Sequence, residues 1–205
     1  MNANDGTLQG IVRMIRFTPE NQELPEAGNV LLSEPFMDDP YFGRKVVLLC
    51  EHNEEGSFGF VLNNYIDIDL NEVMDDLPSL KARISVGGPV KNSNLYYIHT
   101  RADIPDSVPV VDGVYMGGDF DLIKSMIQRG ELPGSQIRFF IGYSGWSAKQ
   151  LDEEILSHSW FVSKAGQGDI MRTDEDNETF WKRLISGMGQ GYDHIANAPS
   201  DPSLN

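Results

Sequence analysis

Short apolar stretches of strand length recur along the middle of the chain, separated by polar and turn-forming residues. Aliphatic and aromatic residues fill these stretches, which is typical of β-strands with one or both faces buried. The segment at residues 53–57, which contains Gly56, has the composition of a hairpin loop. The pattern predicts eight strands, at residues 29–33, 45–51, 58–63, 84–86, 95–100, 107–111, 136–142 and 160–163.

Helical patterns interrupt the strands at four places. Capping signals mark where three of these helices begin: Asp69 is followed by Glu72, Asp119 precedes an amphipathic run, and Ser147 is followed by Gln150. The predicted helices cover about residues 70–77, about residues 120–129, a segment that opens at the Ser147 capping box, and about residues 176–188.

The overall composition is that of an ordinary folded domain, with 40% hydrophobic, 23% charged and 10% aromatic residues. Prolines and glutamates at residues 18–27 favour an extended connector, and asparagine, serine and proline are frequent after residue 194. We therefore predict an N-terminal arm at residues 1–27, a single domain at 28–193 and a disordered tail at 194–205. The arm either covers an edge strand of the sheet or joins a partner subunit.

Acidic residues outnumber basic ones: 31 Asp and Glu against 16 Lys and Arg give a net charge of −15 at pH 7. Nonspecific affinity for nucleic acids depends on Lys and Arg displacing counterions. The basic residues of this chain are scattered and form no stripe, so the charge argues against direct nucleic-acid binding.

Cys50 is the single cysteine, which excludes an intrachain disulfide and a cysteine cluster for a metal, and suits a reducing compartment. The N-terminal residues lack the apolar segment of a secretion signal. The longest apolar run, at residues 46–50, is far shorter than the roughly 20 residues that a membrane helix needs. We expect a cytoplasmic protein that does not span a membrane.

Cys50 and His52 lie two residues apart in a predicted strand, so both side chains point to the same face, as a thiol and its imidazole base would. A lone cysteine that ends an apolar run is more commonly a small core residue, and we favour that interpretation. No third residue that would orient the imidazole can be named from the sequence.

Pairing across the predicted hairpin separates His52 from Asn63. If His52 lies opposite Phe58, Asn63 lies opposite Val47, about 16 Å from His52 at about 3.3 Å per residue. The two side chains then cannot share one small site. Each is expected to hydrogen-bond to the backbone at its own end of the hairpin.

Ser144 lies between a predicted strand and a predicted helix, as the nucleophile of an α/β-hydrolase does, but its glycines have the wrong spacing for that motif. We expect it in a tight strand-to-helix turn and assign no nucleophile. Asp119 follows two glycines at a helix start, where its own carboxylate opposes anion binding. The acidic run at residues 152–154 is expected to face solvent. Neither histidine spacing nor acidic spacing fits a metal site, so we expect no metal and no cofactor.

Three motifs in this order resemble the YqgE/AlgH family: Cys50-Glu51-His52-Asn53 before a glycine turn, then Gly87-Gly88-Pro89, then Gly142-Tyr143-Ser144-Gly145-Trp146 followed by Gln150-Leu151. The resemblance covers about residues 28–188. It implies an α+β fold in which a strongly bent, partly barrel-like mixed sheet is surrounded by about four helices. Members are often labelled transcriptional regulators, but their biochemical function is largely unassigned. Where the family commonly has a basic residue and proline after the hairpin asparagine, this chain has Asn64-Tyr65.

The leading hypothesis from the sequence is a noncatalytic binding or regulatory domain with an unknown protein or small-molecule partner. The predicted interaction surface comprises His52, Asn53, Gly87, Gly88 and Pro89. The alternatives are a small enzyme that uses Cys50 with His52, or Ser144, and a regulator that contacts DNA directly. Weaker site candidates are Cys50, Asn63, Asp119 and Ser144.

Overall fold

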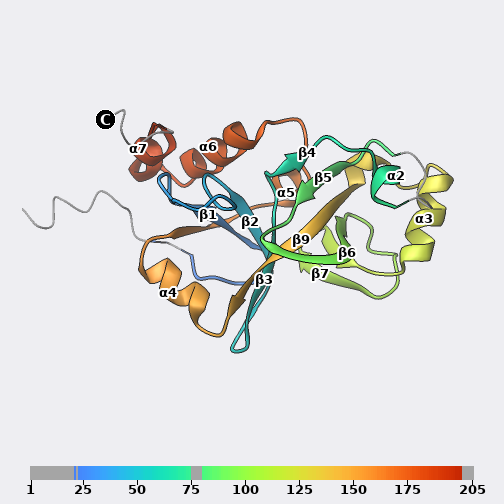
Figure 1. The fold of residues 1–205 in the computed structure, drawn as a ribbon, viewed down its shortest axis with the longest axis horizontal. Helices are drawn as coiled ribbons and strands as arrows, with labels where there is room; N and C mark the ends of the chain where they lie inside the picture. Colours follow the sequence, from blue (N-terminus) through green and yellow to red (C-terminus); the bar gives the residue numbers. More distant parts are fainter. Residues whose placement is uncertain (1–20, 22, 75–79, 200–205) are drawn as a thin grey trace, which may run out of the picture.

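Ten strands form one curled sheet through the centre of the molecule (Figure 1). The structure is a computed structural model that describes residue 21, residues 23–74 and residues 80–199. The strands are β1 (Asn29–Ser33), β2 (Val46–Asn53), β3 (Gly56–Val61), β4 (Tyr65–Ile66), β5 (Arg83–Val86), β6 (Val90–His99), β7 (Ser107–Val111), β8 (Val114–Gly117), β9 (Ile137–Ser147) and β10 (Trp160–Lys164). Their order is β10-β1-β2-β3-β9-β6-β8-β7, and β4 and β5 form a branch attached to β9.

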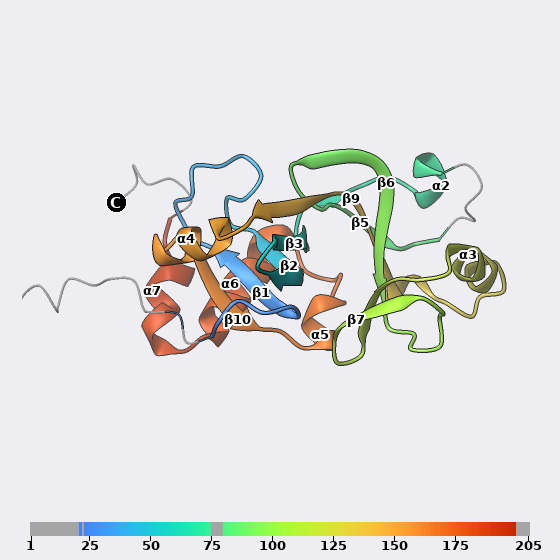
Figure 2. The same cartoon turned by 90° about the horizontal axis from the view of Figure 1, so that it is seen from below.

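Helices cover the sheet at its two ends and on both faces. They are α2 (Leu70–Val73), α3 (Phe120–Gln128), α4 (Gln150–Leu156), α5 (Gln167–Ile170), α6 (Asn177–Gly187) and α7 (Asp193–Ala196), with single 3-10 turns at Gly134–Gln136 and Gln190–Tyr192. Figure 2 shows α6 and α7 at one end of the molecule and α3 at the other. Within the described part of the chain, none of the helices has the length and apolar character needed to cross a bilayer.

Strand β9 joins the two parts of the sheet. Residues 137–141 and Tyr143 pair with β6, β5 pairs with the opposite side of residues 138–141, and residues 144–147 pair with β3. Gly142, near the end of the part that pairs with β6, has a φ of +72°, and a β-carbon there would lie 2.8 Å from the carbonyl oxygen of Val90. The strand therefore changes partners within two residues of a position where only glycine fits without strain.

Both faces of β1 and β2 are buried. On one face, Leu48 belongs to an apolar cluster with Trp181 of α6 and Ile195 of α7. On the other face, Val47 belongs to a cluster with Leu151 of α4. This burial explains why these strands are continuous apolar runs in the sequence instead of alternating ones. A third cluster packs α3 against the first half of β9.

The predicted fold class is confirmed, because the protein has an α+β fold with a bent, mixed sheet in which β5 and β9 are parallel and the other pairs antiparallel. All eight predicted strands are present, but β9 extends to Ser147, beyond its predicted end. The four predicted helices correspond to α2, α3, α4 and α6, although α2 ends at Val73 and residues 75–77 lie outside the described chain. The elements β4, β8, α5 and α7 were missed because they are too short to show a period.

The prediction of a disordered tail from His194 onward is wrong for its first residues. Helix α7 covers residues 193–196, and Ile195 and Ala196 are buried in the cluster that contains Trp181. Arg44 donates hydrogen bonds of 2.7 Å to the carbonyl oxygens of residues 198 and 199. The polar composition of this segment concealed two apolar residues that complete the core; residues 200–205 lie outside the described chain.

The predicted N-terminal arm lies mostly outside the described residues, but its last part contacts the edge of the sheet. The side-chain amide of Asn21 donates to the carbonyl oxygen of Trp160 (3.0 Å) and accepts from the backbone N–H of Val162 (2.8 Å). Lys164 pairs with Glu23 at 3.3 Å. These contacts fit the first of the two roles predicted for the arm, covering an edge strand.

The Gly142→Ala variant tests the constraint on β9. The substitution places a β-carbon in a left-handed conformation against a backbone oxygen, and we expect the free energy of unfolding in urea to fall by about 2 kcal/mol. The matched control is Gly187→Ala, because Gly187 ends α6 and a β-carbon there meets no atom within 4 Å. Equal stability of the two variants would contradict this account.

A buried histidine fixes β6 against β8. His99 is fully buried; its Nε2 lies 2.9 Å from the carbonyl oxygen of Gly117, and its Nδ1 accepts the backbone N–H of Arg101 at 3.2 Å. These partners favour the neutral ring with its proton on Nε2. Burial is the main cause of the lowered pKa of His99, opposed by its backbone hydrogen bonds.

Because the pKa of His99 is lower in the folded chain than in the unfolded chain, the unfolded chain binds more protons as the pH falls through about 6.5. We therefore expect the free energy of unfolding to decrease between pH 7.5 and pH 5.5. In urea unfolding over this pH range, the free energy of unfolding should decrease less for His99→Gln than for the wild type. For His158→Gln, a substitution of an exposed histidine, it should decrease as much as for the wild type. If the free energy of unfolding of His99→Gln decreased as much as that of the wild type, the pH dependence would come from groups other than His99.

Candidate functional site

The hairpin of β2 and β3 projects from the body of the sheet, with α4 beside it (Figure 1). At the tip, His52 lies opposite Ser57, and Glu51, not His52, lies opposite Phe58, and a bulge between Leu49 and Glu51 shifts the pairing further along. The predicted pairing is therefore wrong by one residue at the tip, because the turn has only two residues, 54 and 55. It is wrong by two beyond the bulge, where Val47 lies opposite Val61 and not Asn63.

His52 forms its contacts through side chains instead of the predicted backbone hydrogen bond. Its Nδ1 lies 2.8 Å from Ser57 Oγ, and its Nε2 lies 3.8 Å from a carboxylate oxygen of Asp152 in α4. The exposed fraction of the side chain is 20% for His52 and 52% for Asp152. The structure thus supplies a third residue next to the imidazole, one hundred residues further along the chain, which the sequence did not identify.

Helix α4 is held against the sheet by one carboxylate. Glu154 Oε2 accepts hydrogen bonds from the indole nitrogens of Trp146 (2.9 Å) and Trp160 (2.8 Å). Of the acidic run predicted to face solvent, Asp152 and Glu153 are exposed, whereas Glu154 turns inward to the tryptophans. This bond fixes the position of α4, and so the distance between Asp152 and the hairpin.

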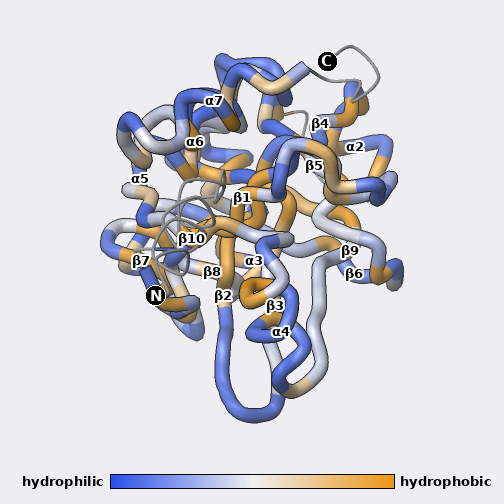
Figure 3. Tube along the Cα trace, turned by 90° about the vertical axis from the view of Figure 1, so that its left-hand side faces the viewer, coloured by the Kyte–Doolittle hydropathy of each residue, from blue (hydrophilic) through white to orange (hydrophobic). Residues whose placement is uncertain are grey.

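The end of the hairpin is polar and acidic. Asn53 donates to Glu51 Oε1 at 2.6 Å and accepts the backbone N–H of Glu55 at 2.8 Å, which orders the turn. Glu51, Asn53, Glu54 and Glu55 are all exposed, and three of them, Glu51, Asn53 and Glu55, line an open hollow of about 190 Å³. Figure 3 shows this hydrophilic tip, with α4 also strongly hydrophilic beside it.

The second part of the predicted surface, Gly87 to Pro89, lies away from the hairpin tip. The carbonyl oxygen of Gly87 accepts the N–H of Val61, which is four residues from Ser57 along β3, or about 13 Å. Gly87 and Gly88 are buried, and Pro89 is half-buried. A β-carbon on Gly88 would lie 2.3 Å from the carbonyl group of Tyr143, so close backbone packing explains this glycine.

Ser144 and Cys50 are both buried inside the sheet. Ser144 lies within β9, not in the predicted strand-to-helix turn, because the strand continues past Gly142; its Oγ donates to the carbonyl oxygen of Gly87 at 3.1 Å. Cys50 is 6% exposed and belongs to the core cluster, and burial raises the pKa of its thiol. The core interpretation of Cys50 is therefore confirmed.

Asn63 and Asp119 bind backbone groups, as predicted. Asn63 is fully buried; it accepts the N–H of Val46 at 2.7 Å and donates to the carbonyl oxygens of Arg44 and Asn177. Asp119 caps α3 by accepting the N–H of Leu122 at 3.0 Å. Over the described ranges 23–74 and 80–199, together with residue 21, no three His, Cys, Asp or Glu side chains gather as metal ligands.

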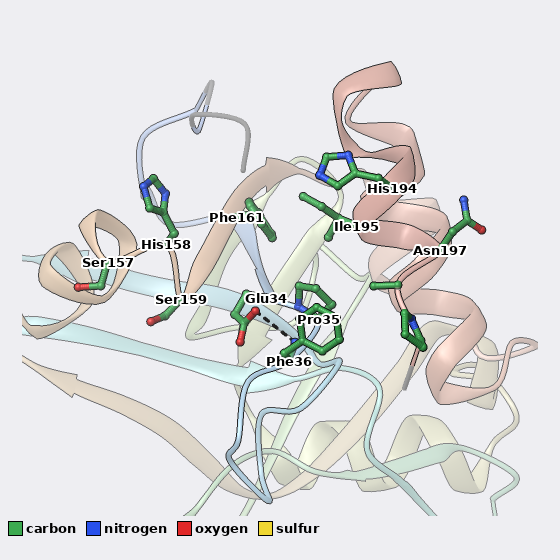
Figure 4. Close-up of a pocket in the computed structure, with 12 residues that line it drawn as sticks. Glu34, Pro35, Phe36, Ser157, His158, Ser159, Phe161, His194, Ile195 and Asn197 are labelled. Atoms are coloured by element: carbon green, nitrogen blue, oxygen red, sulfur yellow. Dashed lines mark hydrogen bonds between the residues drawn. The ribbon is translucent and has the colours of Figure 1, made fainter. Parts of the chain in front are cut away.

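One pocket was missed by the sequence analysis. It is open, has a volume of about 800 Å³, and lies where the β1–β2 link, the end of α4 and α7 meet (Figure 4). The sequence does not reveal this pocket, because the walls of the pocket come from three segments that are far apart in the chain, one of them the predicted tail. The lining residues are Glu34, Pro35, Phe36, Ser157, His158, Ser159, Phe161, His194, Ile195, Asn197, Ala198 and Pro199.

Comparisons with known proteins identify relatives over almost the whole chain. The sequence model of the AlgH-like family, DUF179, matches residues 30–193. A UPF0301 protein of Bacteroides thetaiotaomicron is 39% identical over 186 residues, which is 90% of this chain and 94% of the relative. A UPF0301 protein of Parabacteroides distasonis is 40% identical over 188 residues, again 90% of this chain and 94% of the relative.

Two solved structures have the same fold. The crystal structure of DIP2367 from Corynebacterium diphtheriae matches with a TM-score of 0.71 and 23% identity, over 91% of this chain and 98% of that one. The solution structure of AlgH from Pseudomonas aeruginosa matches with a TM-score of 0.66 and 24% identity, over 87% and 98%. By its sequence match and by its relatives, the chain belongs to the AlgH-like family, the YqgE/AlgH or UPF0301 proteins.

Proposed function

We propose that this protein is a noncatalytic binding or regulatory domain that contacts its partner through the end of the β2–β3 hairpin. The observation that supports this proposal most directly is the exposed polar tip, with His52 and Asn53 at its centre and α4 beside it. Hydrogen bonds within the turn and the bond from His52 to Ser57 hold the tip in one conformation before any partner arrives. Such preorganisation lowers the entropic cost of binding.

The state of the two nucleophile candidates also supports a binding role. The Ser144 hydroxyl is buried and bonded to a backbone carbonyl oxygen, and the Cys50 thiol is buried with a raised pKa. A catalytic thiol needs access and a lowered pKa, which is the opposite environment.

The charge of the tip favours a basic partner surface. Glu51, Glu54 and Glu55 are exposed on the hairpin, and Asp152 and Glu153 are exposed on α4. A phosphate backbone would meet repulsion here, whereas a protein surface with Lys and Arg side chains would gain complementary charge. If the protein regulates transcription, we propose that it does so without direct DNA contact.

Purification of the tagged full chain from its own host at low salt tests the proposal. We expect a stoichiometric partner, identified by mass spectrometry, whose affinity falls about tenfold or more in a His52→Ala, Asn53→Ala double variant. Asp112→Ala, in the exposed β7–β8 turn, is the control and should retain the partner. A partner that binds the double variant equally well, or no bound partner at all, would contradict a role for this tip.

The second candidate function is a small enzyme, and one observation favours it. Ser57, His52 and Asp152 follow one another as a hydroxyl, an imidazole and a carboxylate, with separations of 2.8 Å and 3.8 Å. The order of the ring nitrogens is the reverse of the serine-protease arrangement, in which Nε2 faces the serine. Ser57 is also 8% exposed, which limits attack on a substrate.

Labelling with a fluorophosphonate distinguishes the two functions. An activated Ser57 should form a covalent adduct in the wild-type protein, found by peptide mass spectrometry, and His52→Gln should abolish it. We expect no adduct, since the hydroxyl is buried. Labelling of Ser57 that depends on His52 would favour the enzyme over the binding domain.

A further inference from the structure

The open pocket beside α7 has the size and composition of a site for a small molecule. Its volume of about 800 Å³ lies within the range of roughly 300–1,000 Å³ that is usual for ligand sites. Phe36, Phe161 and Ile195 provide apolar surface, and Figure 4 shows Glu34 beside Phe36, with His158 and His194 on the surrounding walls. Phe36 is 39% exposed although it is aromatic.

Glu34 is held in place by the backbone. Its Oε2 accepts the N–H of Phe36 at 3.2 Å, and its own N–H donates to the carbonyl oxygen of Ser159 at 3.0 Å. Over the part of the chain that the structure describes, neither Lys, Arg nor His forms an ion pair with this half-buried carboxylate. A carboxylate beside an aromatic face is suited to an organic cation, which gains an ion pair and a cation–π contact together.

The basic residue that holds one wall of the pocket is already engaged. Arg44 donates to the carbonyl oxygens of Ala198 and Pro199 and pairs with Glu178 at 3.3 Å. Arg44 therefore stabilises the wall formed by residues 198 and 199 and is not the counter-ion of Glu34.

The wall opposite α7 contains a histidine in an unusual backbone conformation. His158 follows α4 with a φ of +61°, where helices commonly end in glycine. Its N–H donates to the carbonyl oxygen of Ile155, and the next N–H donates to that of Glu154, which forms the helix-ending turn. This turn places an exposed imidazole, a hydrogen-bond acceptor when neutral, at the rim of the pocket, with its ring turned away from Glu34 (Figure 4).

We propose that this pocket binds an organic cation, an ammonium, amidinium or guanidinium group on an apolar body, with Glu34 as its counter-ion. The apolar body would pack on Phe36, Phe161 and Ile195, and the N–H groups of the cation would donate to the carboxylate of Glu34. This inference concerns a different surface from the hairpin tip and does not depend on the function proposed for it.

Benzamidine and benzamide form a matched pair of probes, because they have nearly the same shape and only benzamidine is charged. We expect saturable benzamidine binding to the full chain, seen as shifts of the amide signals of Glu34, Phe36 and Ser159 in NMR spectra. Glu34→Gln keeps an acceptor for the N–H of Phe36 but removes the charge, and it should weaken benzamidine binding about tenfold or more. Asp112→Asn, an exposed carboxylate in the β7–β8 turn, is the control for net charge and should bind like the wild type.

The source of the natural cation is distinguished by repeating the titration with an Arg13→Gln, Arg16→Gln variant. Tighter benzamidine binding to this variant would show that a guanidinium group of the chain's own arm competes for the pocket. Unchanged binding would point to a separate molecule. Equal affinity for benzamidine and benzamide, wild-type affinity in Glu34→Gln, or no saturable binding in either background would overturn the proposal.

Discussion

One strand shared between two sheet segments is the constraint on which the rest of this fold depends. Strand β9 pairs with β5 up to Ile141, with β6 up to Tyr143 and with β3 from Ser144 onward, and the left-handed conformation of Gly142 lies next to this change of partner. The second half of the strand carries Trp146 to the face where Glu154 binds it. The position of α4, and with it the distance from Asp152 to His52, follows from the bend in β9.

The first half of the same strand buries a positive charge. Arg138 is fully buried, and its guanidinium group donates to the carbonyl oxygens of Leu62 and Ile170. The rings of Tyr65 and Phe140 each lie 5.6 Å from its central carbon, and burial lowers its pKa to about 10. Carbonyl oxygens and aromatic faces replace a carboxylate here, and they tie β9 to the end of β3 and to α5. Loss of either contact would leave a desolvated cation, which is costly in a core.

The sequence predicted the elements of the sheet well, because their apolar runs and turn residues are local signals. It also predicted correctly that Cys50 is a core residue and that Asn63 binds backbone groups. It could not predict what depends on tertiary structure: the bulge between Leu49 and Glu51, the approach of Asp152, or the extension of β9 past Gly142. The pocket around Glu34 was hidden for the same reason, since its walls meet only in the folded chain.

The two edge strands of the sheet, β7 and β10, are protected against pairing with another strand in different ways. Strand β7 contains Pro109, which lacks an N–H group, and β10 has both a carbonyl and an N–H group bound by the single side chain of Asn21. That carboxamide has the same donor and acceptor as a peptide group, so it imitates one residue of an additional strand. A neighbouring molecule that approached this border would find the carbonyl group of Trp160 and the N–H of Val162 already engaged, so the row of groups that could template lateral polymerisation of the sheet is interrupted there.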